Sequence, residues 1–424
     1  MNNKRILIPV IAAMGGAFIV IIVFVLGYYL GKSEQLELTE RTPSPVQAQP
    51  QPVAPVQAPV PAQTPPSGQA QYSHPVTDRP IRQVVKFQVG TGNVKTMLAD
   101  ENKVWVGTSH GVIKYNIKDD SHEVLDNKNT PLLSNGIFYL AKFDGKLWVG
   151  TYGGGLHSLE GEEWKSYNIP HGLGDAFIYG ILKVPNGDIW IATWSGANRI
   201  LGGEIDNPDA WQTFTVENTD GGLPNDWVYG IAADKKGNIW LGTEGGIARF
   251  DGEKWRNWNH KEGLGAKYEI VKDDILKTQD TASGQSSHHR RQKIEMGLEN
   301  IDVPFNPNYI VSMLVDDKDR VWLGTWGGGL SILADEKFIT YTTKDGLAGN
   351  YVSMLYQDPA GKIWVGSNQG LSKTERAADN RLGFTNYTVD DGLYSRHVFS
   401  MTMTEDQSIW VGSYGGVAHF VEGL

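Results

Sequence analysis

The sequence contains no cysteine among its 424 residues. Disulfide bonds, thiolate metal sites, cysteine nucleophiles and covalently attached c-type haem are therefore excluded. Basic residues are in deficit as well, because 38 Lys and Arg face 48 Asp and Glu, for a formal net charge of −10. A nucleic-acid partner requires a basic surface that displaces counterions, so this balance argues against nucleic-acid binding.

Long amphipathic helical patterns are absent outside the N-terminus, whereas 50 glycines and many aromatic residues are typical of short strands and tight turns. Seven times a tryptophan is followed by an aliphatic residue, then Gly or Ala, then Thr or Ser. These tryptophans are Trp105, Trp148, Trp190, Trp240, Trp322, Trp364 and Trp410. Five of the six gaps between them are about 40 to 50 residues long, the period of a four-stranded propeller blade. The repeat predicts an all-β, seven-bladed propeller over residues 81–424, with the tryptophans in its core.

The N-terminus differs from the repeats. Residues 6–30 carry no charge over 25 positions, which is long enough to cross a bilayer as a helix. We expect an uncleaved signal anchor. The alternative, a cleaved signal peptide, has a shorter apolar region and an Ala-x-Ala-like site. Lys4 and Arg5 predict that residues 1–5 stay in the cytoplasm and that the rest is exported across a bacterial inner membrane. Residues 31–80, rich in Pro and Gln, predict a flexible linker.

Two features concern the ends and the middle of the ring. The last repeat stops after a third strand at residues 417–421, and residues 81–89 resemble an outer strand. We therefore expect strand 81–89 to complete the last blade, which removes free sheet edges. Between Gly265 and Pro307 the chain carries about 35 extra residues, an insertion at about 266–306. A loop of this length is either functional or disordered, and both alternatives remain open.

The blade motif resembles the two-component regulator propeller repeat. Residues 319–330 read Asp-Arg-Val-Trp-Leu-Gly-Thr-Trp-Gly-Gly-Gly-Leu, and residues 359–371 show much of the same pattern. The resemblance implies a sensor region of a membrane-bound hybrid regulator that detects ligands such as oligosaccharide fragments. This sequence departs from those regulators in carrying one propeller and no Tyr-rich β-sandwich, histidine kinase or DNA-binding region. Direct transcriptional output is therefore not expected.

Aromatic residues gather at one end of the predicted blades. They follow the Thr or Ser of the second strand, or precede the inner strand, on the usual ligand face of a propeller. The candidate ligand-binding residues are Tyr152, Trp194, Trp326, Tyr414, Phe177, Trp227, Tyr309, Tyr351 and His397. Flat, partly polar side chains of this kind stack on sugars or planar molecules, or anchor a partner segment. The alternative is that they only pack on adjacent loops.

Oxygen-bearing side chains lie beside these aromatic positions. Asp226, Asn308, Asn350 and Glu244 could together hold Ca²⁺, which accepts carboxylate and amide oxygens in irregular geometry. The competing interpretation is that Asn and Asp cap turns through the backbone. Three functions follow. The leading hypothesis is a periplasmic propeller that binds a carbohydrate, another small ligand or an envelope protein and performs no chemistry. The alternatives are a scaffold subunit of an envelope complex and a Ca²⁺-assisted hydrolase or lyase.

Overall fold

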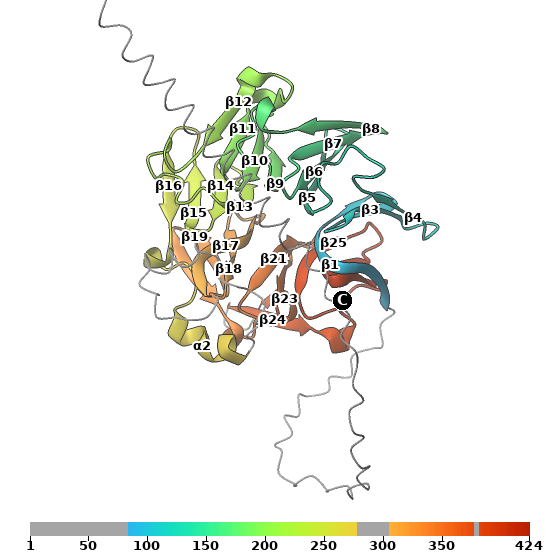
Figure 1. The fold of residues 1–424 in the computed structure, drawn as a ribbon. Helices are drawn as coiled ribbons and strands as arrows, with labels where there is room; N and C mark the ends of the chain where they lie inside the picture. Colours follow the sequence, from blue (N-terminus) through green and yellow to red (C-terminus); the bar gives the residue numbers. More distant parts are fainter. Residues whose placement is uncertain (1–83, 278–304, 377–380) are drawn as a thin grey trace, which may run out of the picture. The chain divides into compact units, whose positions relative to one another are not determined.

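The computed structural model of the chain describes residues 84–277, 305–376 and 381–424. The predicted cytoplasmic stub, membrane span and linker, residues 1–80, lie outside the described residues, as do residues 278–304 of the insertion. Within the three described ranges, no helix combines the length and the apolar character that a membrane span requires. What the structure describes is an all-β propeller, in which separate antiparallel sheets surround a common centre (Figure 1).

Five of the sheets have four strands each. The first comprises β5 (Ile137–Phe143), β6 (Lys146–Thr151), β7 (Leu156–Glu160) and β8 (Glu163–Tyr167), and the second β9 (Ile178–Lys183), β10 (Ile189–Thr193), β11 (Gly196–Ile200) and β12 (Trp211–Phe214). The third comprises β13 (Val228–Ala233), β14 (Ile239–Thr243), β15 (Gly246–Phe250) and β16 (Trp255–Trp258). The fourth comprises β17 (Asn306–Val315), β18 (Val321–Trp326), β19 (Leu330–Ala334) and β20 (Lys337–Tyr341), and the fifth β21 (Val352–Gln357), β22 (Ile363–Ser367), β23 (Gly370–Arg376) and β24 (Leu382–Tyr387). In each, the first strand lies toward the centre of the ring and the last at its rim (Figure 1).

A sixth sheet joins the two ends of the chain. Its strand order is β25-β26-β1-β2-β3-β4. The strands are β1 (Val84–Asp100), β2 (Lys103–Thr108), β3 (Gly111–Asn116), β4 (His122–Leu125), β25 (Val398–Met403) and β26 (Ile409–Phe420). Residues 84–88 of β1 pair with β26, and residues 94–100 pair with β2. The first described strand therefore links the last part of the chain to its beginning.

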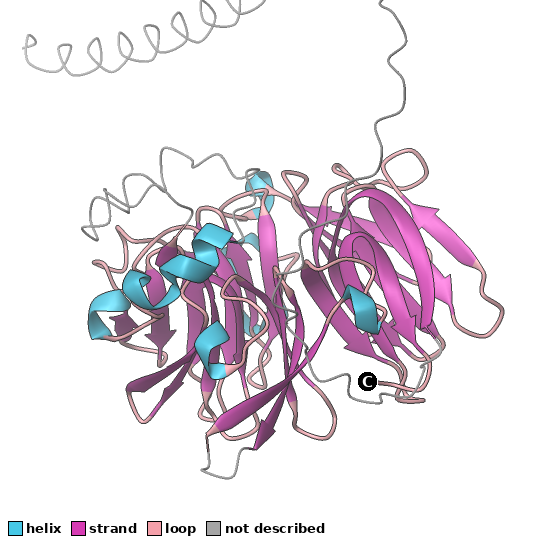
Figure 2. Cartoon of the chain, turned by 90° about the horizontal axis from the view of Figure 1, so that it is seen from below, coloured by secondary structure: helices cyan, strands magenta, loops and turns pink. Residues whose placement is uncertain are grey.

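In the described ranges, helical segments lie in the connections between strands (Figure 2). The short 3₁₀ helices are η1 (Ile169–His171), η2 (Leu201–Gly203), η3 (Pro208–Ala210), η4 (His260–Glu262), η5 (Thr343–Asp345) and η6 (Val389–Asp391). The α-helix α2 (Tyr268–Lys277) begins the insertion. Val271 and Ile275 of α2 pack with Phe305, and Tyr351 of the propeller packs against this cluster. The described ends of the insertion are thus folded onto the ring.

The seven repeated tryptophans form the core between neighbouring sheets, as the sequence predicted. Their exposed fractions lie between 1% and 6%. Trp322, for example, packs with Val352, Ile363 and Val365 of the next sheet. A large aromatic residue at the same position of every repeat buries area between neighbouring sheets, because each sheet touches only its two neighbours.

Candidate ligand-binding face

Each sheet has two chemically different ends. We call the turn end the one where the inner strand turns into the second strand, and the loop end the one where the second strand passes into the third. At the turn end an aspartate holds the core tryptophan: Trp322 Nε1 donates to Asp316 Oδ2 at 2.9 Å. Asp316 Oδ1 also accepts from the backbone amides of Lys318 and Arg320. The same Asp–Trp bond recurs at three other sheets, for Trp105, Trp240 and Trp364.

The loop end is closed by the Thr or Ser that ends the second strand. Thr243 Oγ1 donates to the carbonyl oxygen of Gly246 at 2.8 Å and accepts from the amide of Gly245. Gly246 has a φ of +131°, and a Cβ there would lie 2.3 Å from the carbonyl oxygen of Trp258. Only glycine fits this loop, which explains its recurrence. The loop is held by these atoms, so the residue directly after the Thr is left free to vary.

A β-bulge occurs at the loop end of every inner strand. The pairing with the second strand slips by one residue, for example between Ile178 and Gly180, and the extra residue stays unpaired. The extra residues, here called the bulge residues, are Lys95, Phe138, Tyr179, Tyr229, Val311, Ser353 and Phe399. All seven are partly exposed, although the residue before each is buried. Bulges re-aim side chains in this way, often near functional sites.

Seven of the nine predicted aromatic-face residues meet in one continuous cluster. Tyr152 contacts Phe177, Phe177 contacts Trp194, and Trp194 contacts Trp227, with ring centroids 4.6, 4.7 and 4.9 Å apart. Farther along the ring, Tyr309 stacks on Trp326 at 5.6 Å, and Trp326 meets Tyr351 at 5.4 Å. The pairs Phe177–Trp194 and Tyr309–Trp326 each belong to one sheet, and the other three contacts cross to the next sheet.

Bulge residues form a second row of the same cluster. Phe138 stacks on Tyr179 at 5.0 Å, Tyr179 meets Tyr229 at 4.8 Å, and Tyr229 meets Tyr309 at 4.7 Å. Phe138, Tyr179 and Tyr229 were not among the predicted face residues. Strand alternation could have found them, since Tyr179 and Tyr229 each follow a predicted face residue by two positions. The two rows together, which we call the aromatic arc, are Phe138, Tyr152, Phe177, Tyr179, Trp194, Trp227, Tyr229, Tyr309, Trp326 and Tyr351.

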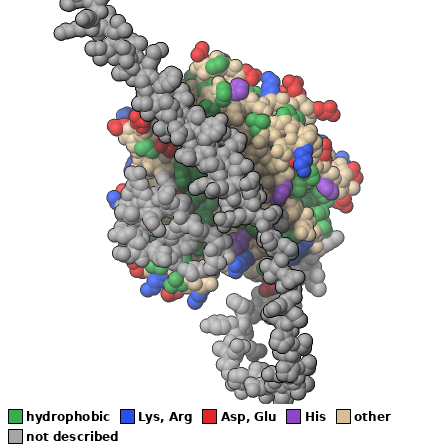
Figure 3. All heavy atoms as spheres, in the orientation of Figure 1, with side chains coloured by type: hydrophobic (Ala, Val, Ile, Leu, Met, Phe, Trp, Pro, Cys, Tyr) green, Lys and Arg blue, Asp and Glu red, His purple; other side chains and the backbone are tan. Residues whose placement is uncertain are grey.

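The arc is partly open to solvent. Tyr152 is 48% exposed, and the other members are partly buried. At the far end, Tyr351 packs against the cluster formed by α2 and Phe305. On the visible part of the face drawn in Figure 3, acidic and basic side chains lie mainly toward the rim.

The buried phenols of Tyr229 and Tyr309 remain protonated. Burial raises the pKa of Tyr309 and Tyr229 far above the usual value, and the negative charge of Glu244 acts in the same direction. The two hydroxyl groups are hydrogen-bonded to each other. Glu244 itself is fully buried. The arc thus presents neutral hydroxyl groups beside apolar ring faces.

The other two predicted face residues stand apart from the arc. His397 stacks on the bulge residue Phe399, with centroids 6.2 Å apart. Tyr414 is 54% exposed and lies opposite Asn93 in the ladder between β26 and β1. The ammonium of Lys95 lies 4.7 Å from the centroid of Phe399. Burial lowers the pKa of Lys95. We call Lys95, His397 and Phe399 the cationic corner.

The candidate Ca²⁺ ligands bond to the backbone of the connections that carry them. Asp226 Oδ1 accepts from the amide of Val216 at 2.7 Å. Asn308 Oδ1 accepts from His260 at 2.6 Å, and Asn350 Oδ1 accepts from Thr343 at 3.0 Å. These bonds fit the turn-capping interpretation. Glu244 lies among the tyrosines of the arc, and the described part of the chain brings no three His, Cys, Asp or Glu together in metal-binding geometry. Ca²⁺ binding stays a prediction.

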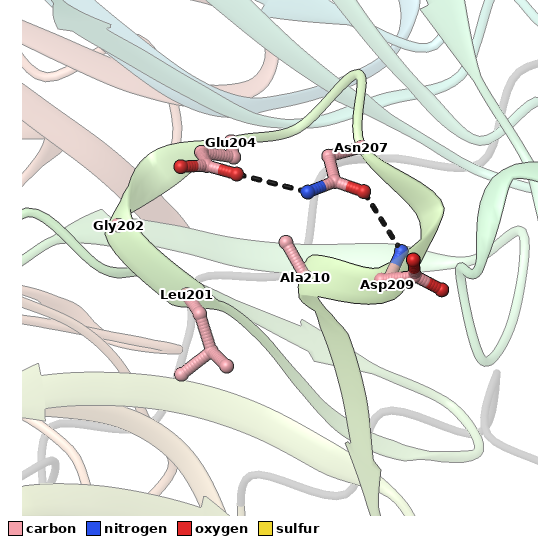
Figure 4. Close-up of a pocket in the computed structure, with 6 residues that line it drawn as sticks. All are labelled: Leu201, Gly202, Glu204, Asn207, Asp209 and Ala210. Carbon is pink, nitrogen blue, oxygen red and sulfur yellow. Dashed lines mark hydrogen bonds between the residues drawn. The ribbon is translucent and has the colours of Figure 1, made fainter.

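A small cavity of about 270 Å³ lies at the turn end, in the connection between β11 and β12 (Figure 4). It is lined by Leu201, Gly202, Glu204, Asn207, Asp209 and Ala210. The side chain of Asn207 donates a hydrogen bond to Glu204 and accepts one from the backbone amide of Asp209. Because those polar groups satisfy one another within the loop, the cavity offers little to a ligand compared with the arc.

Four segments of the chain match the family model for the two-component regulator propeller, at residues 172–195, 222–245, 304–327 and 346–369. Three of the segments begin at a Gly-Leu connection, and all four include the bulge and the second strand. No curated protein is similar enough in sequence to count as a relative.

Solved structures share the fold. The extracellular domain of the hybrid two-component system BT3049 from B. thetaiotaomicron has a TM-score of 0.60 and 20% identity, covering 80% of this chain and 41% of that one. The extracellular domain of the one-component system BT4673 from the same organism has a TM-score of 0.55 and 16% identity, covering 80% and 40%. Virginiamycin B lyase from Staphylococcus aureus has a TM-score of 0.52 and 13% identity, covering 80% and 98%. This chain spans less than half the length of the two extracellular domains.

Proposed function

We propose that this chain, four segments of which match the two-component regulator propeller model, is an extracytoplasmic propeller of sensory type. The aromatic arc is its binding surface for a carbohydrate or another flat ligand, and no chemistry is performed on that ligand. The chain is related by fold to extracellular domains of two-component sensor systems, which supports an exported sensory role.

The continuity of the arc carries the proposal. The core tryptophans repeat in every sheet and are buried, so the fold accounts for them. The arc residues differ from sheet to sheet: the bulge position alone holds Phe, Tyr, Lys, Val and Ser. A fold that accepts all of these does not require any one of them. Aromatic faces with phenol donors beside them give a planar ligand both stacking area and hydrogen bonds.

The rest of the architecture follows from the strand pairing and the N-terminal sequence. Counting the six-strand sheet as two blades, with residues 84–88 of β1 in the last blade and residues 94–100 in the first, we infer a closed ring of seven blades. Residues 6–30 anchor the chain in the inner membrane, and residues 31–80 hold the propeller in the periplasm. The charge-free stretch with Lys4 and Arg5 before it supports this placement.

Ligand binding by the arc is tested with the full chain in detergent micelles. Neutral oligosaccharides and small aromatic compounds are titrated by isothermal calorimetry, for the wild type and for Trp194→Ala and Trp227→Ala. We expect each substitution to weaken binding by about tenfold or more, as truncation of a central aromatic contact does. The control is Ile339→Ala, an exposed apolar residue on the outer strand β20. Equal affinity of the wild type and both tryptophan variants would refute the arc as the site.

A second candidate is an envelope scaffold that uses the insertion. Helix α2 exposes two apolar side chains, Ile270 at 42% and Leu276 at 53%, and an exposed pair on one helix suits a protein partner. The variant Ile270→Ser with Leu276→Ser leaves the arc intact. If it abolished recovery of a membrane complex while ligand binding by the arc persisted, the scaffold function would hold in addition. Unchanged recovery of the complex would refute the scaffold function.

A further inference from the structure

The inference concerns Lys95 and rests on the proposed function of the arc. The seven bulge residues occupy the same position of successive inner strands, and Lys95 is the one charged residue among them. Four others are aromatic, and the remaining two are Val311 and Ser353. A bulge places its extra residue out of the ladder, so Lys95 occupies the position at which other sheets present the phenol or phenyl rings of the arc.

No carboxylate neutralises this lysine among the described residues. Several lysines elsewhere on the ring pair with acids, as Lys183 does with Asp144 at 2.6 Å. Lys95 instead rests on the face of Phe399 at 4.7 Å. Burial alone accounts for the direction in which its pKa moves, with no acid opposing it. A partly buried cation normally has a charged partner, because the loss of hydration is otherwise uncompensated.

The neighbours of Lys95 do not supply that partner. His397 stacks on Phe399 at an interplanar angle of 10° and carries no negative charge. Acidic groups at the loop end, such as Asp175, Asp226 and Glu244, belong to other sheets, and none of them contributes to the shift in the pKa of Lys95. In a chain with a net charge of −10, a corner with a lysine and no acid is a local exception.

We propose that the Lys95 ammonium binds a carboxylate of the ligand whose flat part lies on the aromatic arc. A single ammonium on an aromatic ring matches a monoanion. A phosphate or sulfate group is bound by several donors, typically an arginine fork or a set of backbone amides, and the corner has neither. The ligand class is therefore an acidic sugar or an aromatic carboxylate rather than a neutral glycan.

The experiment compares acids with their neutral analogues. Glucuronate and glucose form one pair, and benzoate and benzyl alcohol the other. All four are titrated against the full chain and against Lys95→Met, which keeps the length of the side chain but removes its charge. We expect the wild type to prefer each acid by about 10- to 100-fold, the range of a charge-assisted hydrogen bond. Lys95→Met should lose that preference, and Lys95→Arg should retain part of it.

Three outcomes separate the possibilities. Equal affinity of the wild type for acid and neutral analogue, with Trp194→Ala still weakening both, would overturn the carboxylate assignment and leave the arc as the site. The carboxylate assignment would also be overturned if inorganic sulfate or phosphate competed with glucuronate more strongly than benzoate does. No binding of any of the four compounds would count against both the arc and the corner.

The unfolding temperature of the ligand-free variant provides an independent readout. A lysine kept for ligand binding destabilises the ligand-free protein, because its ammonium loses hydration without gaining a charged partner. Lys95→Met should therefore unfold at the same temperature as the wild type or above it. A clear fall in the unfolding temperature would show that Lys95 serves the fold and would refute the inference.

Discussion

The turn end and the loop end of each sheet are built from the same repeat but have opposite tolerances. At the turn end the same aspartate–tryptophan bond recurs, as in the pairs Asp234–Trp240 and Asp358–Trp364. At the loop end the bond from a Thr or Ser to a glycine carbonyl also recurs, as from Thr193 to Gly196, but the bulge position changes from Lys95 to Tyr179 to Ser353. The turn end therefore carries residues that the fold requires, whereas the loop end can change its side chains to suit a ligand. Other scaffolds that carry their sites on loops divide their residues in the same way.

The largest effect expected from this comparison is at the turn end. Trp322→Ala removes a side chain that is 1% exposed, and the cost should be about 3–5 kcal/mol of unfolding free energy because a large cavity is left. Urea denaturation of the full chain measures it. Affinity for a ligand of the arc should be unchanged in the fraction that remains folded. If stability changed by less than about 1 kcal/mol, the turn end would not be the structural end.

The second prediction concerns a residue at the loop end that stabilises the fold and is therefore an exception to the comparison. His157 of β7 is fully buried, and its Nδ1 lies 2.8 Å from Ser166 Oγ. Burial lowers the pKa of His157 to about 4, against 6.5 for an exposed imidazole. As the pH falls below 6.5, His157 becomes protonated in the unfolded chain but stays neutral in the folded chain. Stability is therefore complete above about pH 6.5 and falls as the pH decreases toward 4, by about 3 kcal/mol at most.

Unfolding by urea between pH 4 and 7 measures the slope for His157. The matched variant is His157→Asn, since Asn198 occupies the equivalent position of the next sheet and bonds to the amide of Gly174. That variant should lose the pH dependence that this one histidine contributes. A wild type and a variant with identical pH profiles would show that His157 is not held neutral by the fold.

Much of this division could be predicted from the sequence. The Trp-x-Gly-Thr period indicates the propeller, because every repeat must bury the same face against its neighbour. Trp194 and Trp227 could be placed on one face because they flank equivalent strands. The contacts between sheets could not be predicted in the same way. Lys95 and Phe399 come from opposite ends of the chain, and only closure of the ring brings them within 4.7 Å.

The bulges were the other missing element. A regular ladder would alternate pairing without interruption, so an unpaired Tyr229 between Val228 and Gly230 has no signal in propensity alone. Its signal is the repeated pattern of a buried aliphatic residue between two larger side chains, as in Trp227-Val228-Tyr229. The packing of α2 against Tyr351 had no signal at all, because nothing in the insertion repeats.

At the loop end, the effect of a substitution should fall on binding and leave the fold almost intact. Trp227→Ala removes a partly exposed arc residue that contacts Trp194 at 4.9 Å. We expect ligand affinity to fall by about tenfold or more, with a loss of about 1 kcal/mol of unfolding free energy. Calorimetric titration and urea denaturation on the same preparation separate the two quantities. A stability loss as large as that of Trp322→Ala would erase the distinction between the ends.

The smallest effect is expected at a bulge residue. It is measured by making the same substitution at the bulge residue and at its neighbour in the chain. Ile310 is fully buried and paired with Thr325, whereas Val311 is the bulge residue. The change of either one to Thr swaps a methyl-bearing group for a hydroxyl. Val311→Thr should alter the unfolding free energy by no more than about 0.5 kcal/mol, because its hydroxyl can be hydrated. Ile310→Thr should cost about 2 kcal/mol or more, since the hydroxyl is buried without water and a methylene is lost. Similar values for both variants in urea denaturation would mean that Val311 is as enclosed as its neighbour. The bulge would then not turn its residue toward the centre of the ring, and the argument that places Lys95 there would fail with it.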